Sequence, residues 1–184
     1  MTIPQRRDST TLFDSAYQRH HRVVYAYIFG QVQEADASAD VLQDTFVRVW
    51  RHVSCLRTIQ QDRQLYWILS IARNQIRDYY RRKVVRHRVE QNYDVALVPV
   101  AGDPHLELQT KETQSTVDAA IRALPPALRV PLTLSVMGGL NSKEIAAALE
   151  RPAGTVRYQI AEARKRIVRH IGQAMGDGQD GGGE

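Results

Sequence analysis

Apolar residues recur at the spacing of a helix along most of this chain, and polar or glycine- and proline-containing stretches interrupt the repeat. That spacing places the apolar side chains on one face of each helix, so it predicts amphipathic helices that pack together. We therefore expect an all-α protein. The helices are expected over residues 12–30, 38–53, 65–88, 106–123, 127–136, 142–149 and from 155 onward.

Residues that interrupt or cap helices suggest where the first of these helices begin and end. Residues 1–9 are expected to form a loose lead-in, and Gly30 is expected to end the first helix. Ser38 is a candidate N-cap for the second helix, because its hydroxyl can accept from a free backbone amide. Residues 54–64 lose the apolar repeat and are interpreted as a polar loop.

The helices fall into two groups, because helical periodicity disappears over residues 89–105, where acidic residues accompany Pro99, Gly102 and Pro104. This composition is typical of a flexible, mildly acidic linker. We expect two small helical domains joined by that linker and followed by a disordered tail. The expected ranges are 10–88 for the first domain, 89–105 for the linker, 106–175 for the second domain and 176–184 for the tail.

The segment from Asn141 to Arg169 has the pattern of a helix-turn-helix. Asn141 can cap the first helix, and Glu144 stands three residues later, where a capping-box carboxylate reaches back to the cap. Pro152 and Gly154 are expected to break the helical run, and Thr155 to open the second helix.

The second helix of this pair would turn Val156, Ile160, Ala163 and Ile167 inward. Its other faces carry cations and polar groups that suit base edges and phosphates in a major groove. These are Arg157, Tyr158, Gln159, Arg164, Lys165, Arg166 and Arg169. The pattern predicts a reader of duplex DNA; the alternative is a helical hairpin with a solvated basic face.

The helix expected over residues 65–88 interleaves aromatic with basic side chains. Cations meet phosphates while rings stack on unpaired bases, so this mixture favours single-stranded nucleic acid. The aromatic residues are Tyr66, Trp67, Tyr79 and Tyr80, and the basic ones are Arg73, Arg77, Arg81, Arg82, Lys83, Arg86 and Arg88.

Composition narrows the remaining classes of function. The net charge of +5 is modest but clustered on these basic helices. Cys55 is the single cysteine, which excludes an internal disulfide, and His52 and Cys55 have no further ligands at a zinc-binding spacing, so no metal and no cofactor are expected. No segment has the length and apolarity of a signal peptide or membrane span, so we expect a cytoplasmic protein without membrane contact of its own.

Two motifs in the first domain and three in the second resemble a known family. DVLQDTFVRVWR at residues 40–51 and YWILSIARNQIRDYYRR at residues 66–82 resemble the second conserved domain of bacterial extracytoplasmic-function (ECF) sigma factors, within the sigma-70 family. LPPALRVPLTL at residues 124–134, with SKEIAAAL and GTVR, resembles their fourth domain. The resemblance implies an RNA polymerase sigma factor that directs promoter-specific initiation, without catalysis of its own. It also implies core RNA polymerase, promoter DNA and an anti-sigma factor as partners.

The resemblance also assigns roles by position. The residues implied to contact the clamp coiled coil of core polymerase are Asp40, Gln43, Asp44 and Arg48. Those implied to lie along the melted upstream element are Arg73, Asn74, Asp78, Arg81 and Arg82, with a flipped base captured by residues 54–64. Those implied to approach the distal duplex element are Thr155, Arg157, Tyr158, Gln159 and Lys165.

The sequence departs from the family pattern at several positions. Glu150 stands in a turn where the family usually has glycine, so a positive φ there would cost about 1 kcal/mol. Tyr158 and Gln159 replace a common Ser-Arg pair, and Glu162 replaces a common basic residue. These changes bear on which distal DNA sequence is recognised.

Two other classes of function compete with a sigma factor. A two-module transcriptional regulator would bind duplex DNA without joining polymerase, but it needs neither the 40–51 helix nor the aromatic and basic helix. An enzyme acting on nucleic acid would need clustered carboxylates or a nucleophile beside a base, and the acids here are scattered.

Overall fold

The computed structural model describes residues 4–90 and 108–176, and over those ranges every regular element is a helix. The expectation of an all-α fold is confirmed there. The elements are α1 (Pro4–Val32), α2 (Ala35–Arg51), α3 (Val53–Thr58), the 3₁₀ turn η1 (Gln61–Arg63), α4 (Gln64–Glu90), α5 (Leu108–Ala123), α6 (Pro126–Val136), α7 (Ser142–Leu149) and α8 (Ala153–Gly176). Most of the expected linker and tail lies outside the described residues.

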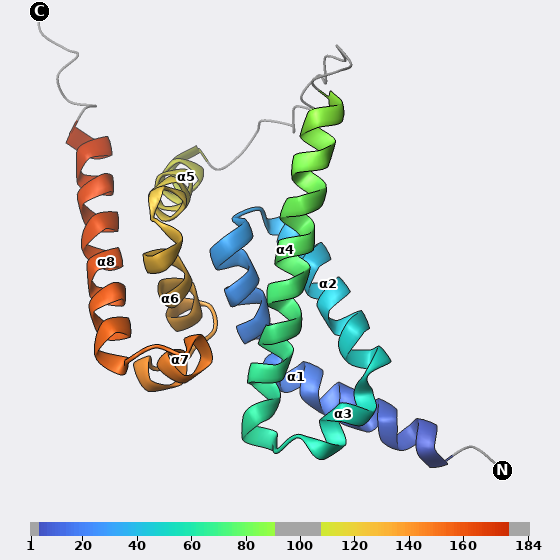
Figure 1. Ribbon diagram of the computed structural model, residues 1–184. Helices are drawn as coiled ribbons and strands as arrows, with labels where there is room; N and C mark the ends of the chain where they lie inside the picture. Colours follow the sequence, from blue (N-terminus) through green and yellow to red (C-terminus); the bar gives the residue numbers. More distant parts are fainter. Residues whose placement is uncertain (1–3, 91–107, 177–184) are drawn as a thin grey trace, which may run out of the picture.

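The first group of helices packs α1, α2 and α4 around an apolar core that α3 closes at one end (Figure 1). The apolar faces expected for the first three helices supply this core. Its fully buried side chains include Val24, Ile28, Val41, Val49, Leu56 and Ile68.

Helix α1 is longer at both ends than the sequence predicted. It already begins at Pro4, so the expectation of a loose lead-in over residues 4–9 is wrong; proline is tolerated in the first turn, where its missing N–H would be unpaired anyway. Gly30 does not end the helix, which continues to Val32 and stops before Gln33, where φ is +67°. Gly30 is used instead for a close packing contact with another helix.

Two further expectations in this domain are corrected. Ser38 is not the cap of α2, because α2 already begins at Ala35 and Ser38 lies fully buried inside it. Residues 54–64 are largely helical rather than a polar loop, as α3 and η1. The reason is Leu56, which is 1% exposed and anchors α3 in the core, while the Gln64 side chain donates to its carbonyl at 3.1 Å. A single apolar residue in a polar stretch is too weak a pattern to predict this.

The second group packs α8 against α5, α6 and α7. The capping box of α7 is present: Asn141 Oδ1 accepts from the amides of Lys143 and Glu144, and Glu144 accepts from the Asn141 amide at 2.7 Å. Glu150 ends α7 in the left-handed conformation, with φ 53° and ψ 47°, so the condition for the strain considered from the sequence is met.

Helix α8 starts at Ala153, two residues before the predicted Thr155. Gly154 therefore lies in the first turn of α8, and the expectation that it interrupts the helical run is wrong. The carbonyl of Pro152 accepts from the Val156 amide at 3.2 Å and so begins the helical hydrogen bonds. The predicted inner face is confirmed, since Val156, Ile160 and Ala163 are buried and Ile167 is partly buried.

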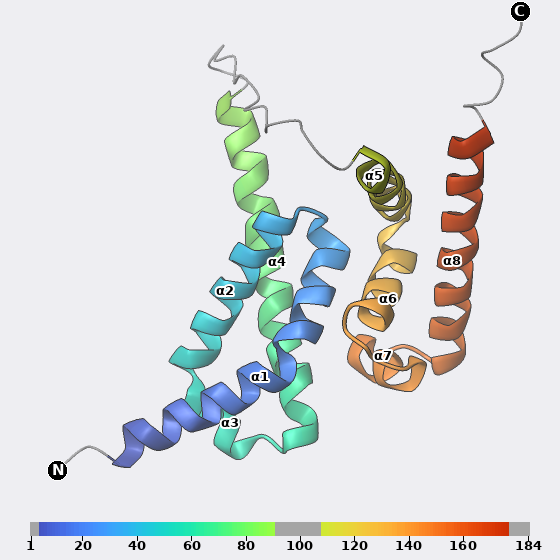
Figure 2. The ribbon, with the colours of Figure 1, turned by 180° about the vertical axis from the view of Figure 1, so that it is seen from behind.

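The two groups contact each other where the C-terminal turns of α1 lie against α6, as both views show (Figures 1 and 2). Their buried apolar residues form one continuous cluster. Among the described helices, none is long and apolar enough to cross a bilayer.

Candidate nucleic-acid and protein interfaces

The four residues predicted to face core polymerase lie exposed on α2, but two of them also pair with α4. Arg48 Nη2 lies 3.7 Å from Asp78 Oδ2, and Arg82 Nη2 lies 3.6 Å from Asp44 Oδ2. Asp78 and Arg82 belong to the set predicted to contact melted DNA. The structure therefore ties the predicted polymerase residues to the predicted DNA residues across the α2–α4 contact. Asp40 and Gln43 line the groove of about 1110 Å³ between these helices.

An aromatic groove opens beside Gln43, on the face of α2 turned toward the N-terminal half of α1. It has a volume of about 500 Å³ and is lined by Phe13, Tyr17, Ala39, Leu42, Gln43, Phe46, Val47 and Trp50. The Phe13 and Trp50 rings meet edge to face with centroids 5.3 Å apart. Trp50 nevertheless remains 40% exposed, so the groove is an apolar surface open to a partner.

The sequence did not predict this groove, because apolar spacing alone does not show how much of a helix's apolar face its neighbours cover. Phe46 is buried, whereas Trp50 and Val47 are exposed. The available signal was the width of the apolar stripe on α2. Val47 and Trp50 extend that stripe past the arc that two neighbouring helices can cover.

Of the α4 residues predicted to contact the separated strand, Arg73, Asn74 and Arg81 are exposed, while Asp78 is half-buried. Asp78 also lies 3.9 Å from Arg81, in addition to its contact with Arg48. The carboxylate thus lies between two guanidinium groups. We expect it to orient Arg81 rather than to approach a phosphate.

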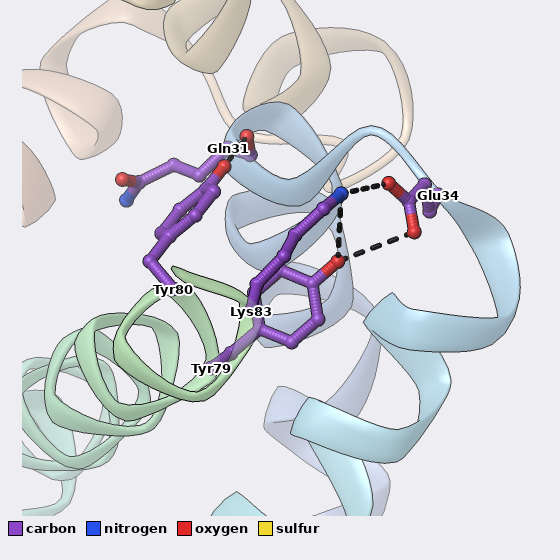
Figure 3. A network of polar contacts seen from close by, with 5 residues as sticks. All are labelled: Gln31, Glu34, Tyr79, Tyr80 and Lys83. Atoms are coloured by element: carbon purple, nitrogen blue, oxygen red, sulfur yellow. Dashed lines mark hydrogen bonds and ion pairs between the residues drawn. The ribbon is translucent and has the colours of Figure 1, made fainter. Parts of the chain in front are cut away.

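Tyr79 and Lys83 contact Glu34 in the turn between α1 and α2, and Tyr80 contacts Gln31 in the last turn of α1 (Figure 3). Lys83 Nζ lies 2.6 Å from one carboxylate oxygen of Glu34, and Tyr79 Oη donates to the other at 3.2 Å. Tyr80 Oη donates to the Gln31 carbonyl at 2.7 Å. The hydrogen bond from Lys83 lowers the pKa of Glu34, and the same bond raises the pKa of Lys83. Three members of the aromatic and basic set thus make contacts within the protein.

The segment predicted to capture a flipped base, residues 54–64, passes from α3 through η1 into α4. Gln61, Asp62 and Arg63 of η1 are exposed. With its amide oxygen turned toward α1, Gln61 accepts from the Arg19 guanidinium at 2.8 Å.

On α8, the predicted duplex-binding residues lie outside the buried face, with Gln159 at its edge. Thr155, Arg157 and Lys165 are exposed, and Tyr158 is 67% exposed, so it does not pack on the preceding helix. Gln159 is half-exposed and accepts from Arg151 at 3.3 Å. Glu162, the acid in this basic helix, pairs with Arg166 at 2.7 Å, and that hydrogen bond lowers its pKa.

Over the described residues, no three His, Cys, Asp or Glu side chains gather closely enough to hold a metal ion. His20 is buried in the first domain, and desolvation lowers its pKa to about 4. Its Nε2 atom has no hydrogen-bond partner.

Comparison with known proteins finds both halves of the chain in one family. Residues 16–85 match the family described as Sigma-70 region 2, and residues 114–167 match Sigma-70, region 4. The ECF RNA polymerase sigma-E factor of Salmonella typhimurium is 30% identical over 168 residues, which cover 84% of each chain. The RNA polymerase sigma-H factor of Pseudomonas aeruginosa is 29% identical over 174 residues, covering 88% of this chain and 87% of the relative.

Two solved structures share the fold. One is the sigma factor RpoE of Bartonella quintana in complex with the anti-sigma factor NepR, with a TM-score of 0.52 and 20% identity over 90% of this chain and 95% of that chain. The other is CnrH in complex with the cytosolic domain of CnrY, with a TM-score of 0.53 and 23% identity over 91% of this chain and 89% of that chain. Because a relative 30% identical covers most of the chain and both regions match in order, this chain belongs to the ECF sigma factors of RNA polymerase.

Proposed function

We propose that this sigma factor uses three exposed faces for three steps: α2 joins core polymerase, α4 holds the separated promoter strand, and α8 docks on duplex DNA. The observation that supports this division most strongly is that most of the predicted polar residues on the three helices are exposed, with Asp78 and Gln159 half-buried. The two proposed domains span residues 10–88 and 106–175. The chain itself catalyses no reaction, and it acts in the cytoplasm because its template and polymerase are there.

Core polymerase binds the rim of the aromatic groove. Gln43 lines this groove and Asp40 lines the neighbouring groove between α2 and α4, so together they give charge and hydrogen-bond complementarity to a basic coiled coil. The exposed edge of Trp50 supplies apolar area. Asp44 and Arg48 contribute less directly, because each is already within 4 Å of a charged partner on α4.

The separated promoter strand lies along α4 at Arg73, Asn74 and Arg81, whose exposed side chains can contact phosphates and stack on bases. Asp78 and Arg82 support this surface through their pairs with Arg48 and Asp44. A flipped base is held near residues 59–63, where exposed polar groups of η1 adjoin the first turn of α4.

Helix α8 enters the major groove of the distal element by its N-terminal turns. Thr155, Arg157, Tyr158 and Gln159 reach the base edges, and Lys165 contacts a phosphate about two turns later.

An anti-sigma factor is a further proposed partner. The aromatic groove is the surface that suits it, because a bound apolar helix would cover Trp50 and Gln43 and so exclude core polymerase.

Reconstituted transcription tests the proposal. Core polymerase is incubated with genomic fragments, with and without this chain, and the 5′ ends of the transcripts are mapped. Discrete new start sites are expected with the chain and should be lost with Arg157→Ala combined with Tyr158→Ala. A chain that binds duplex DNA but never associates with core polymerase would instead be a two-module regulator.

A further inference from the structure

The turn η1, beside which a flipped base is proposed to be held, is fixed at its base and exposed at its tip. Leu56 is buried below the turn, and the Gln64 side chain, only 6% exposed, donates to the Leu56 carbonyl at 3.1 Å. This hydrogen bond joins the two ends of the segment. Residues 60–63 between them are exposed, and the Arg63 amide donates to the Gln60 carbonyl at 2.8 Å. The polar groups at the tip are therefore presented to solvent on a short, closed loop.

Arg19 of α1 contacts the tip of this turn. Its Nη1 and Nη2 atoms donate to a single oxygen, Oε1 of Gln61, at 2.8 and 2.9 Å. The oxygen must face Arg19, because the reverse orientation of the amide would set an NH2 group against the guanidinium, donor against donor. Nη2 also donates to Ser15 Oγ, one turn earlier in α1, at 3.4 Å. Arg19 and Gln61 are both exposed, so the contact contributes little to stability. Its consequence is that the Gln61 amide has one orientation.

The contact determines which atoms Gln61 can offer to a ligand. An amide oxygen has two lone pairs, and the two donors of Arg19 occupy both. The two N–H groups of the Gln61 amide remain, and no acceptor among the described residues binds them. Gln61 is therefore held as a hydrogen-bond donor whose acceptor is already used.

A glutamine held as a donor suits some bases better than others. A free glutamine pairs with adenine by accepting from N6 and donating to N7. With its oxygen occupied, the same amide would meet the adenine amine donor against donor. Guanine instead presents two neighbouring acceptors, O6 and N7, and an unpaired cytosine presents N3 and O2. The contact with Arg19 therefore favours guanine or cytosine over adenine.

We propose that Gln61 is a specificity-determining residue for the flipped base, and that Arg19 is the positioning residue that makes Gln61 a donor only. The proposal deepens the proposed function, because it rests on a base being held near residues 59–63. The site then selects a base with neighbouring acceptors, guanine or cytosine, and disfavours adenine. Because the guanidinium fixes the amide before the strand arrives, binding costs little side-chain freedom at this position.

Selection of promoter strands by the reconstituted holoenzyme tests these roles. The probe is a bubble template whose non-template strand is randomised across the upstream melted element, and the retained strands are sequenced. The wild type is compared with Gln61→Ala, Gln61→Glu and Arg19→Ala. The matched control is Arg122→Ala, which removes an exposed cation of α5 whose side chain contacts no residue of η1. Affinity for core polymerase and the midpoint of thermal unfolding are measured for each variant, so that a loss of folding is recognised.

At one position of the randomised strand, the wild type and Arg122→Ala should enrich guanine or cytosine over adenine by about three- to tenfold, the discrimination that one hydrogen bond supplies. Gln61→Ala should lose that preference. Gln61→Glu keeps a partner for Arg19 but turns an acceptor outward, so it should lose guanine and gain adenine. Arg19→Ala frees the amide oxygen, so adenine should rise at the same position. Core affinity and thermal stability should stay unchanged, whereas a merely structural role would lower recovery of all strands without changing the selected base.

Enrichment of adenine by the wild type, at the position that Gln61→Ala changes, would overturn the donor-only contact. The same selected base in the wild type and in Arg19→Ala would overturn the positioning role, and an unchanged motif with Gln61→Ala would overturn the proposal as a whole. In each of these cases the wild type still selects a motif, so the proposed function stands. A wild-type holoenzyme that binds the duplex distal element but selects no motif in the melted element would instead reject base capture itself, and this proposal with it.

Discussion

Arg82 of α4 pairs with Asp44 of α2 at 3.6 Å between Nη2 and Oδ2. Both side chains are at least half exposed, so the pair itself contributes little to stability, typically about 0–1 kcal/mol. Its consequence is functional. Asp44 is proposed to bind polymerase and Arg82 to support the strand-binding surface, and each orients the other. A substitution of either residue can therefore affect binding of both core polymerase and the promoter strand.

Charge reversal distinguishes a direct role of Asp44 in polymerase binding from a role in positioning Arg82. Asp44→Arg should weaken binding to core polymerase, because it removes a carboxylate and leaves two cations facing each other on α2 and α4. The double variant Asp44→Arg with Arg82→Asp restores an opposite-charge pair without restoring the carboxylate on α2. We expect it to recover thermal stability but not polymerase affinity, as measured by fluorescence anisotropy. Full recovery of affinity by the double variant would mean that Asp44 acts only by positioning Arg82.

The strand-binding role of α4 predicts a template-dependent defect. Arg73→Ala combined with Arg81→Ala should reduce initiation several-fold more on closed duplex than on a template with a pre-melted bubble, because exposed cations hold the separated strand. Abortive transcript yields on the two templates provide the measurement. Lys83→Ala is the matched control, since its ammonium pairs with Glu34. The same deficit on both templates would exclude a role in strand separation.

Local features of the sequence predicted those parts of the fold that depend on neighbours along the chain. The helix faces followed from apolar spacing, and the α7 cap followed from Asn141 and Glu144. Gly30 was misinterpreted as a helix end because its constraint comes from Val130, a hundred residues away in sequence. Long-range packing decides such positions, and no local pattern reports it.

Arg129 was missed for the same reason, although a signal was present. It is a cation within an almost wholly apolar helix, and a helix that is apolar on every side is expected to be buried on every side. A buried arginine requires a set of acceptors, so its position between two domains was in principle inferable. The identity of those acceptors, the carbonyls of Gly30, Arg122 and Leu124, could come only from the structure.

Because burial lowers the pKa of His20, we expect the protein to lose stability in mild acid. Its pKa is about 4 in the folded protein, against 6.5 for an unperturbed histidine, so the unfolded chain binds the proton more readily. Stability is therefore full above about pH 6.5 and declines as the pH falls toward 4, by on the order of 2–3 kcal/mol. Urea unfolding of the wild type and of His20→Leu between pH 7 and pH 4.5 measures this. The variant should show a flatter dependence; parallel curves would assign the acid sensitivity to other groups.

Because Glu150 has a left-handed backbone conformation, we expect its replacement by glycine to stabilise the protein. Its φ of 53° and ψ of 47° lie in the left-handed region, where a side chain costs about 1 kcal/mol relative to glycine. Glu150→Gly should raise the free energy of unfolding by about 0.5–1 kcal/mol, measured by urea denaturation. Glu150→Ala removes the same carboxylate but keeps Cβ, so it should not stabilise. An equal gain in both variants would attribute the effect to charge rather than to backbone strain.

Arg151 is expected to affect how α8 reads the distal element, because it contacts a proposed base-reading residue. This residue donates to Gln159 at 3.3 Å, so the Gln159 amide is already oriented in the free protein, at the N-terminal end of the recognition helix. A glutamine in that position can make a bidentate contact with adenine, which contributes about 1–3 kcal/mol of discrimination. Lys165, two turns further on, can reach only a phosphate, which contributes equally to all sequences.

Selection from a randomised distal element distinguishes these roles. Gln159→Ala should change the preferred base at one position, whereas Lys165→Ala should preserve the motif, weaken binding and flatten its salt dependence. Arg151→Ala is the informative third variant. If Arg151 only orients Gln159, Arg151→Ala should weaken the base preference at the same position of the motif that Gln159→Ala changes. The Gln159 amide is still present in that variant, but its orientation is less fixed. A change at a different position would mean that Arg151 contacts DNA itself, and an unchanged motif with Gln159→Ala would remove Gln159 from base recognition.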